Sequence, residues 1–206
     1  MTILNGKFFA KINQIADRII YLGYMNLIWI LFSLLGLGVL GVFPATAAMF
    51  AVYRQEKIHK RAINFKMYWS YYKENFWQAN IIGWILAIIG YILYLDFHLI
   101  TFMEGTFADI VYSAIFAITI IYLLVLCYIF PVFTHFKLSI GRYFLSALTM
   151  VVTKPVQTIL IGVVSIFHVY VMLRIHFLIP LFGVSVWVYF VTQLTQSAFN
   201  KNNKAI

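Results

Sequence analysis

Long apolar runs separated by short polar connectors are the main pattern of this chain. A transmembrane helix needs about 20 consecutive apolar residues, and most of these runs approach that length. One run, residues 42–53, is too short for a full crossing at about 1.5 Å of rise per residue. The predicted spans are residues 19–36, 42–53, 79–95, 107–130, 155–173 and 179–198. We therefore expect an all-α fold, a polytopic transmembrane helix bundle of about six helices with a short second one. Five full spans are the alternative.

The connectors predict amphipathic helices at the membrane interface. In residues 64–78 the aromatic positions follow the i, i+4, i+7, i+11 spacing of one helix face. These positions are Phe65, Trp69, Tyr72 and Phe76. Aromatic residues opposite lysines are typical of a helix in the headgroup layer, although a connector packed on the bundle fits the same spacing. Residues 139–154 predict a second such helix. Within a single integral membrane domain, residues 1–206, we expect residues 1–18 to form an amphipathic lead-in and residues 199–206 a polar tail.

Glycine and proline mark the expected breaks. Gly36, Gly38 and Gly41 loosen the backbone after the first run. Pro44 suits the first turn of a new helix, because proline lacks the N–H that is unbonded there. Pro131 is expected to end the span before it.

Composition and charge agree with this pattern. Apolar residues make up 64% of the chain and charged residues 10%, against about 45–50% and about 25% in soluble domains. The net charge of +9 follows the positive-inside rule, since the basic residues cluster in connectors. We therefore expect the lipid bilayer and no nucleic acid as a partner, with both chain ends in the cytoplasm. The first apolar run exceeds the 7–15 residues of a signal peptide and is interpreted as a retained span.

A few polar residues lie inside the apolar runs. Such groups hydrogen-bond to neighbouring helices or mark a solute path. The candidate intramembrane polar contacts are Asn26, Ser33, Thr46 and His168, with Ser113 and Thr119 as further positions along a path. Their small number and the absence of ionisable partners argue against an autonomous ion-coupled transporter.

A second candidate site lies on the predicted outer side. Its residues are Asp96, His98, Glu104, Asp109, Arg174 and His176. Carboxylates beside aromatic rings suit polyhydroxylated ligands, because the rings cover sugar C–H faces while the carboxylates accept hydroxyl hydrogen bonds. A solvated loop beside an aromatic belt is the alternative.

Motifs of catalysis and metal binding are absent from the sequence. There is no Walker A loop, G-x-S-x-G, H-E-x-x-H or Cys/His zinc spacing. Cys127 is the single cysteine, and the five histidines are scattered. We expect no catalytic, cofactor or metal site, and we expect that the chain is not an enzyme.

Several short segments resemble the YesL-like family of bacterial membrane proteins, a domain of unknown function. They are NLIWILFS at 26–33, Gly41, PATAA at 44–48, NFWQA at 75–79, and Phe130-Pro131. The resemblance covers most of the chain, although Leu34-Leu35 stands where the family often has Leu-Pro.

This resemblance implies a multi-pass protein of the bacterial cell membrane, from a family often encoded beside carbohydrate uptake and glycan-degradation systems. We therefore expect an accessory component of carbohydrate uptake, with a transporter subunit as partner. The alternatives are a membrane scaffold or sensor without transport activity, and a small-solute permease.

Overall fold

The computed structural model describes residues 2–59 and 65–202, with side chains described for residues 10–58 and 65–199. Every regular element in this part of the chain is helical, which confirms the all-α class. The elements are α1 (Thr2–Leu35), α2 (Val42–His59), α3 (Phe65–Leu99), η1 (Ile100–Phe102), α4 (Thr106–His135), α5 (Ile140–Thr153), α6 (Pro155–Arg174), η2 (His176–Leu178), α7 (Ile179–Phe182) and α8 (Ser185–Asn202).

The short helix α2 lies at the centre of the fold. It packs against α1, α3, α4 and α8. From residue 45 to residue 53 all of its side chains except Thr46 are buried. Ala45, Ala47 and Ala48 are small enough to let the neighbouring helices come close, as small residues do between membrane helices. The resulting cluster of α1, α2, α8 and the adjoining ends of α3 and α4 is called the core below.

The turn between α1 and α2 depends on glycine. Gly38 has a positive φ of 76°, a conformation that glycine adopts without steric cost. A Cβ on Gly41 would overlap the carbonyl group of Ser33. The buried amide of Asn80 in α3 donates to the carbonyl oxygens of Leu40 at 3.0 Å and Phe76 at 2.9 Å. These contacts hold the turn closely against α3.

The predicted connector 64–78 and the predicted span 79–95 form one continuous helix, α3. Its aromatic face packs around Phe32 of α1, with ring centroids 4.9–5.5 Å from that ring. The rings in contact are those of Phe65, Tyr68, Trp69 and Tyr72. The face packs on α1 as the packing alternative describes, while Phe65 and Trp69 remain 48% and 38% exposed. That this helix lies in the headgroup layer stays a prediction.

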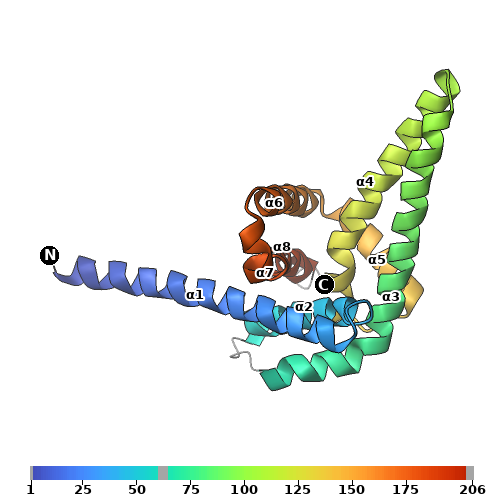
Figure 1. Ribbon diagram of the computed structural model, residues 1–206. Helices are drawn as coiled ribbons and strands as arrows, with labels where there is room; N and C mark the ends of the chain where they lie inside the picture. The colour runs from blue at the N-terminus through green and yellow to red at the C-terminus, as the bar shows by residue number, and fades with distance from the viewer. Residues whose placement is uncertain (1, 60–64, 203–206) are drawn as a thin grey trace.

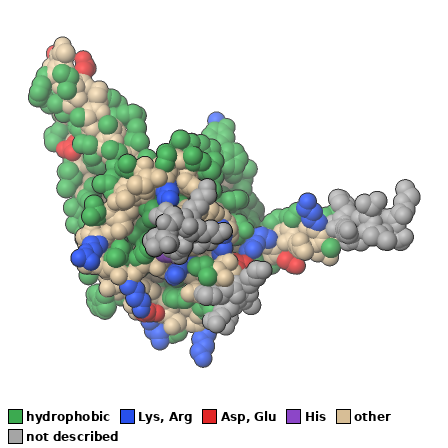
Figure 2. All heavy atoms as spheres, turned by 180° about the vertical axis from the view of Figure 1, so that it is seen from behind, with side chains coloured by type: hydrophobic (Ala, Val, Ile, Leu, Met, Phe, Trp, Pro, Cys, Tyr) green, Lys and Arg blue, Asp and Glu red, His purple; other side chains and the backbone are tan. Residues whose placement is uncertain are grey.

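Beyond the core, α3 and α4 form a long antiparallel hairpin that projects away from the other helices (Figure 1). The Tyr122 hydroxyl of α4 donates to the Leu86 carbonyl oxygen of α3 at 2.9 Å. Residues 79–130 contain no Lys or Arg. In the space-filling view the projecting arm is mostly apolar and acidic near its tip, whereas Lys and Arg side chains gather around the core (Figure 2).

Pro131 lies inside α4, so the prediction that it ends the helix is wrong. A proline in a helix removes one backbone donor, here the one that would bond the Cys127 carbonyl oxygen. Thr134 Oγ1 shares its proton between two other carbonyl oxygens, those of Phe130 at 3.0 Å and Pro131 at 3.1 Å. The helix continues through the proline to His135.

The C-terminal half combines one regular span with a broken one. The bounds of α5 and α6 agree closely with the predicted connector 139–154 and span 155–173. The span predicted at 179–198 is not one continuous helix, because α7 and α8 are separated by a sharp break. The helical segments 176–182 and 185–199 meet there at a bend of 61°.

Four of the described helices are long and apolar enough to cross a membrane: α1 over residues 10–35, α3 with η1, α4 and α6. The bent pair would make a fifth. Residues 2–18 of the predicted lead-in 1–18 are continuous with the first span in α1, and Met1 lies outside the described residues. Helix α2 is not among these candidates, so the count agrees with the five-span alternative rather than with six. Figure 1 also shows α1 lying across the direction of the hairpin.

Candidate functional site

Two of the predicted intramembrane polar residues meet at the break between α7 and α8. Asn26 of α1 donates through Nδ2 to the carbonyl oxygens of Pro180 at 2.8 Å and Ile179 at 3.4 Å. Its Oδ1 accepts hydrogen bonds from the backbone N–H groups of Val184 at 2.9 Å and Ser185 at 3.1 Å. One side chain thus bonds the carbonyl groups on one side of the break and the N–H groups on the other.

This arrangement uses the whole hydrogen-bonding capacity of Asn26. A primary amide has two N–H donors and an oxygen with two lone pairs, and each of them has a partner here. The side chain is also 1% exposed. Unpaired backbone groups cost several kcal/mol in hydrocarbon, so the amide stabilises the broken helix. Asn26 therefore has no free group for a solute.

His168 approaches the same break from α6. Its Nε2 lies 2.8 Å from the Gly183 carbonyl oxygen, and because a carbonyl only accepts, Nε2 is the donor. Asn26 and His168 line a groove of about 520 Å³ between α1, α6 and the break. Apart from these two residues, Trp29 and Gly183, the lining is aliphatic or proline: Ile30, Val169, Met172, Leu173, Ile179, Pro180 and Val184.

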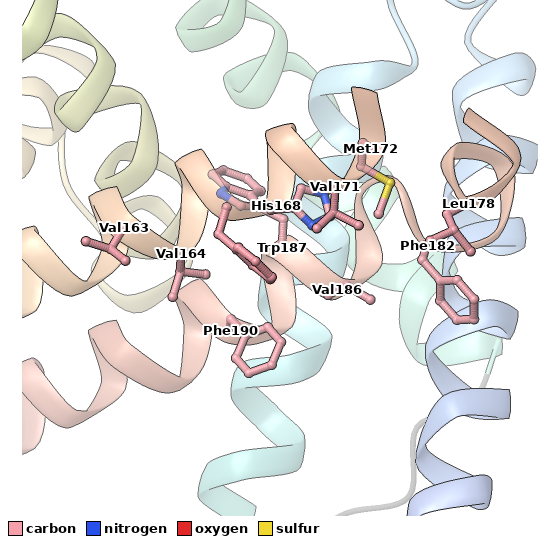
Figure 3. A pocket seen from close by; sticks show the side chains of 11 residues that line it. Val163, Val164, His168, Val171, Met172, Leu178, Phe182, Val186, Trp187 and Phe190 are labelled. Carbon is pink, nitrogen blue, oxygen red and sulfur yellow. The ribbon is translucent and has the colours of Figure 1, made fainter. Parts of the chain in front are cut away.

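A neighbouring groove of about 420 Å³ lies between α6, α7 and α8, with His168 in its wall (Figure 3). Val164, Val171, Val186 and Phe190 are among the side chains around it. The indole Nε1 of Trp187 donates to Ser165 Oγ at 2.9 Å, so this polar atom is also bonded within the protein. The surroundings of the break suit an apolar occupant.

The other intramembrane polar candidates are dispersed. Thr46 Oγ1 accepts from Trp29 Nε1 at 3.0 Å and donates to the Val42 carbonyl at 2.8 Å. Ser33 is buried, and its hydroxyl has no hydrogen-bond partner among the described residues. Ser113 and Thr119 each donate to a carbonyl four residues earlier in α4. These residues do not form a continuous polar path with Asn26.

The candidate outer-side residues lie in two separate places. Asp96, His98, Glu104 and Asp109 surround the hairpin tip, whereas Arg174 and His176 lie where α6 meets η2. Figure 1 shows these two places well apart. The Arg174 guanidinium lies 5.4 Å from the ring centre of Tyr170 on its own helix.

No metal-binding cluster joins these residues. The described part of the chain contains no group of three or more His, Cys, Asp or Glu side chains that could hold a metal ion. The hairpin tip and the α6 end therefore do not combine into one candidate site.

Sequence reasoning missed a polar cavity of about 610 Å³ at the opposite end of α4. It is lined by residues of α2, α3, α4, α5 and the connector after α4, including Arg54, Tyr71, Glu74, Gln78, His135 and Lys137. The available signal was the position of Arg54 directly after the long buried run of α2. The ion pair of Arg18 with Glu56 (2.6 Å) was missed as well, because the two residues lie on different helices.

The described helices include four that are long and apolar enough to cross a membrane. The polar groups at the α7–α8 break bond to one another, as polar groups in membrane helices must. These features define the class of polytopic membrane proteins. The chain belongs to the family described as "Protein of unknown function, DUF624", which matches residues 22–97. This finding confirms the resemblance to YesL-like proteins.

Three similar proteins come from Bacillus subtilis (strain 168), and each is described as uncharacterized. YteU is 33% identical over 181 residues, which cover 87% of this chain and 81% of YteU. YesL is 30% identical over 191 residues, covering 91% of this chain and 89% of YesL. YesV is 27% identical over 168 residues, covering 81% of each. No solved structure matches the chain.

Proposed function

We propose that this chain is a non-catalytic accessory protein of the bacterial cell membrane that binds a transporter subunit and assists carbohydrate uptake. One observation carries this proposal. The Asn26 amide and the His168 Nε2, the polar groups that meet at the helix break, bond within the protein. A protein without a solute path acts on uptake through a partner.

The exposed face of α6 supports a binding role. Only 11% of the apolar window of α6 is buried within the chain, against 33% for α1 and 39% for α4. On α6 the exposed aliphatic residues recur at Val156, Ile159, Val163 and Ile166, a spacing that places them on one helix face. This α6 face is proposed to meet the partner.

The association with carbohydrate uptake rests on the family resemblance. Affinity-tagged chain, isolated in mild detergent from a host that carries its own uptake systems, is expected to retain a transporter subunit. A chain that retains no transporter subunit, in a host whose deletion strain grows normally on every glycan tested, would refute the proposal. A retained sensor or scaffold complex without transporter subunits would favour the scaffold alternative.

The α6 face provides a sharper version of this experiment. In the variant Ile159→Ala/Ile166→Ala, both residues more than half exposed, we expect much less co-isolated partner with unchanged folding. The matched control is Ile92→Ala/Ile110→Ala on the projecting hairpin, where both residues are also exposed. Equal loss in both variants would indicate a nonspecific effect of apolar area and would remove α6 from the proposal.

The broken helix favours a small-solute permease as the second candidate. Discontinuous membrane helices form the substrate sites of many transporters, and the α7–α8 break with His168 is such a feature. Purified chain in liposomes, without any partner, decides between the two functions. Solute flux above that of protein-free liposomes would favour the permease, whereas its absence together with partner binding favours the accessory role.

A further inference from the structure

The polar cavity at the end of α4 has a cationic wall. Arg54 enters it from α2 and Lys137 from the connector after α4. His135, in the last turn of α4, adds no charge near pH 7, because burial and the neighbouring Arg54 lower its pKa to about 4. Glu74 of α3 is the acidic residue of the lining. Arg18 and Glu56 form the single ion pair among the described residues. Within this part of the chain, Arg54 therefore has no carboxylate partner, and Glu74 is not paired with it.

Arg54 is only partly satisfied by the protein. Its Nη1 donates to the Thr134 carbonyl oxygen at 2.6 Å, and the partial negative charge at the C-terminus of α4 favours a cation there. Its Nε is buried and has no acceptor in the described part of the chain. Burial lowers the pKa of the Arg54 guanidinium, yet an arginine stays protonated in proteins. A half-buried cation without a counter-ion is costly.

The remaining donors of the cavity complement an oxyanion. Gln55 and Gln78 bring side-chain amides to the wall, and Lys137 brings an exposed ammonium group. Tyr143 has another role, because its hydroxyl accepts from the Leu138 N–H at 3.0 Å and donates to the Phe136 carbonyl at 3.3 Å. These two bonds hold the connector that carries Lys137 in place. The cavity therefore has fixed walls and an excess of donors.

We propose that this cavity binds the phosphate group of a phosphate ester, with the Arg54 guanidinium as its main contact and Lys137 and Gln78 beside it. A guanidinium matches the geometry of phosphate oxygens with two parallel hydrogen bonds. Basic pockets between membrane helices bind phospholipid headgroups, and a soluble phosphate monoester presents the same group. The cavity volume of about 610 Å³ lies within the range of small-molecule sites.

Binding is measured on the full chain in dodecyl maltoside with three probes. Glycerol 3-phosphate represents a soluble ester, dioctanoyl phosphatidic acid represents a lipid, and dioctanoyl glycerol is the lipid control without phosphate. Isothermal titration and native mass spectrometry report affinity and bound species. Binding of the first probe alone identifies a soluble ester, binding of the second alone identifies a headgroup, and binding of both identifies the phosphate group itself. Each of these results supports the proposal.

The variants test whether the bound phosphate lies in this cavity. Arg54→Gln is expected to weaken binding at least about tenfold, because a hydrogen bond to a charged group contributes more than a neutral one. Gln78→Glu, at an exposed wall position, is expected to weaken it by repulsion without disturbing the fold. The control is Arg142→Gln, since Arg142 is exposed on α5 outside the cavity lining.

Two results would overturn the proposal. One is that neither phosphate probe binds the unaltered chain, in which case Arg54 only caps the C-terminus of α4. The other is that Gln78→Glu, and Arg54→Gln if that variant folds, bind both probes as tightly as the unaltered chain does.

Discussion

The core and the hairpin use the same apolar composition in two different ways. In the core, Met49, Phe50 and Tyr53 of α2 are at most 1% exposed, and hydrogen bonds join residues more than 150 positions apart. On the hairpin, Tyr91 and Tyr94 are more than 60% exposed. The stability of the core therefore depends on contacts within the chain, whereas the apolar side chains of the hairpin depend on contacts with the surrounding lipid or a partner protein.

This difference shows that hydropathy alone does not identify a membrane-facing helix. Helix α2 and the hairpin both contain apolar runs in the sequence. The apolar side chains of α2 are mostly buried, whereas many of those on the hairpin are exposed. In lipid, helices associate through close packing and hydrogen bonds, because burial of apolar area brings little gain there. Substitutions that remove packing or hydrogen bonds should therefore affect the core much more than the hairpin.

The largest effect is expected at Phe32, which is fully buried among the aromatic rings of α3. Phe32→Ala should destabilise the protein by about 3 kcal/mol, since it leaves a cavity that the neighbouring rings fill only in part. Phe116→Ala on the hairpin, where the ring is 52% exposed, should change stability by less than about 0.5 kcal/mol. Steric-trapping measurements in bicelles give both values. Equal losses would contradict the division into core and hairpin.

A somewhat smaller loss is expected at Asn26. Asn26→Leu removes four hydrogen bonds, at a cost of about 2–3 kcal/mol. The Ile179 carbonyl keeps its bond from the Gly183 N–H, whereas the Pro180 carbonyl and the N–H groups of Val184 and Ser185 lose the partner that Asn26 supplied. Ser113→Ala is the matched change on the hairpin, because the Ser113 hydroxyl bonds only to the carbonyl of Asp109 on its own helix. Limited proteolysis near residue 183, together with the unfolding free energy, reports the difference. An Asn26→Leu variant as stable as the unaltered chain would mean that the amide does not hold the break.

Within the hairpin, Tyr122→Phe should have a small and local effect. It removes the hydrogen bond to the Leu86 carbonyl, which contributes about 1 kcal/mol. Hydrogen exchange should accelerate in the neighbouring turns of α3 while the core keeps its protection. Tyr112→Phe is the control, since the Tyr112 hydroxyl makes no hydrogen bond within the described residues. Faster exchange across the core would show that the two regions unfold together.

The last prediction concerns threading and involves no loss of stability. In a Cys127→Ala background, Thr101→Cys at the hairpin end should react with an impermeant thiol reagent in intact cells, whereas Ser70→Cys should not. The physical reason is the charge asymmetry between the acidic hairpin tip and the basic core. Gln14→Cys then tests on which side α1 begins. Reaction at residue 70 without reaction at residue 101 would invert this orientation.

Local sequence patterns predicted much of the fold. The amphipathic pattern of residues 139–154 predicted α5, and the apolar run 155–173 predicted α6. Asn26 was identified because an amide in an apolar run needs partners. Each of these features depends on one segment of the chain and can therefore be inferred from the local sequence.

Properties that depend on two segments could not be predicted in this way. Residues 65–78 and the span that follows have different local patterns and were predicted as separate elements, whereas the structure joins them in one helix whose first part packs on Phe32 of α1. The α7–α8 break is stabilised by Asn26, which lies outside that segment. Arg54 directly follows the apolar run of α2 in the sequence, and the structure places it in the wall of a cavity formed with α3, α4, α5 and the connector after α4. Contacts between segments that are distant in the sequence are determined by tertiary packing. The local periodicity of apolar residues does not predict them.

The hydrogen bonds of Asn26 also have a consequence for biogenesis. The ribosome synthesises Asn26 154 residues before Pro180, so α1 enters the membrane long before the backbone groups that its amide will bond exist. During this interval the amide must bond to water, to lipid headgroups or to the insertion machinery. The hairpin, in contrast, receives Tyr122 only 36 residues after Leu86 and can pair as soon as both helices have emerged. A nascent chain that is truncated before α7 therefore carries an unsatisfied amide in its first helix, a feature by which membrane quality control can recognise it.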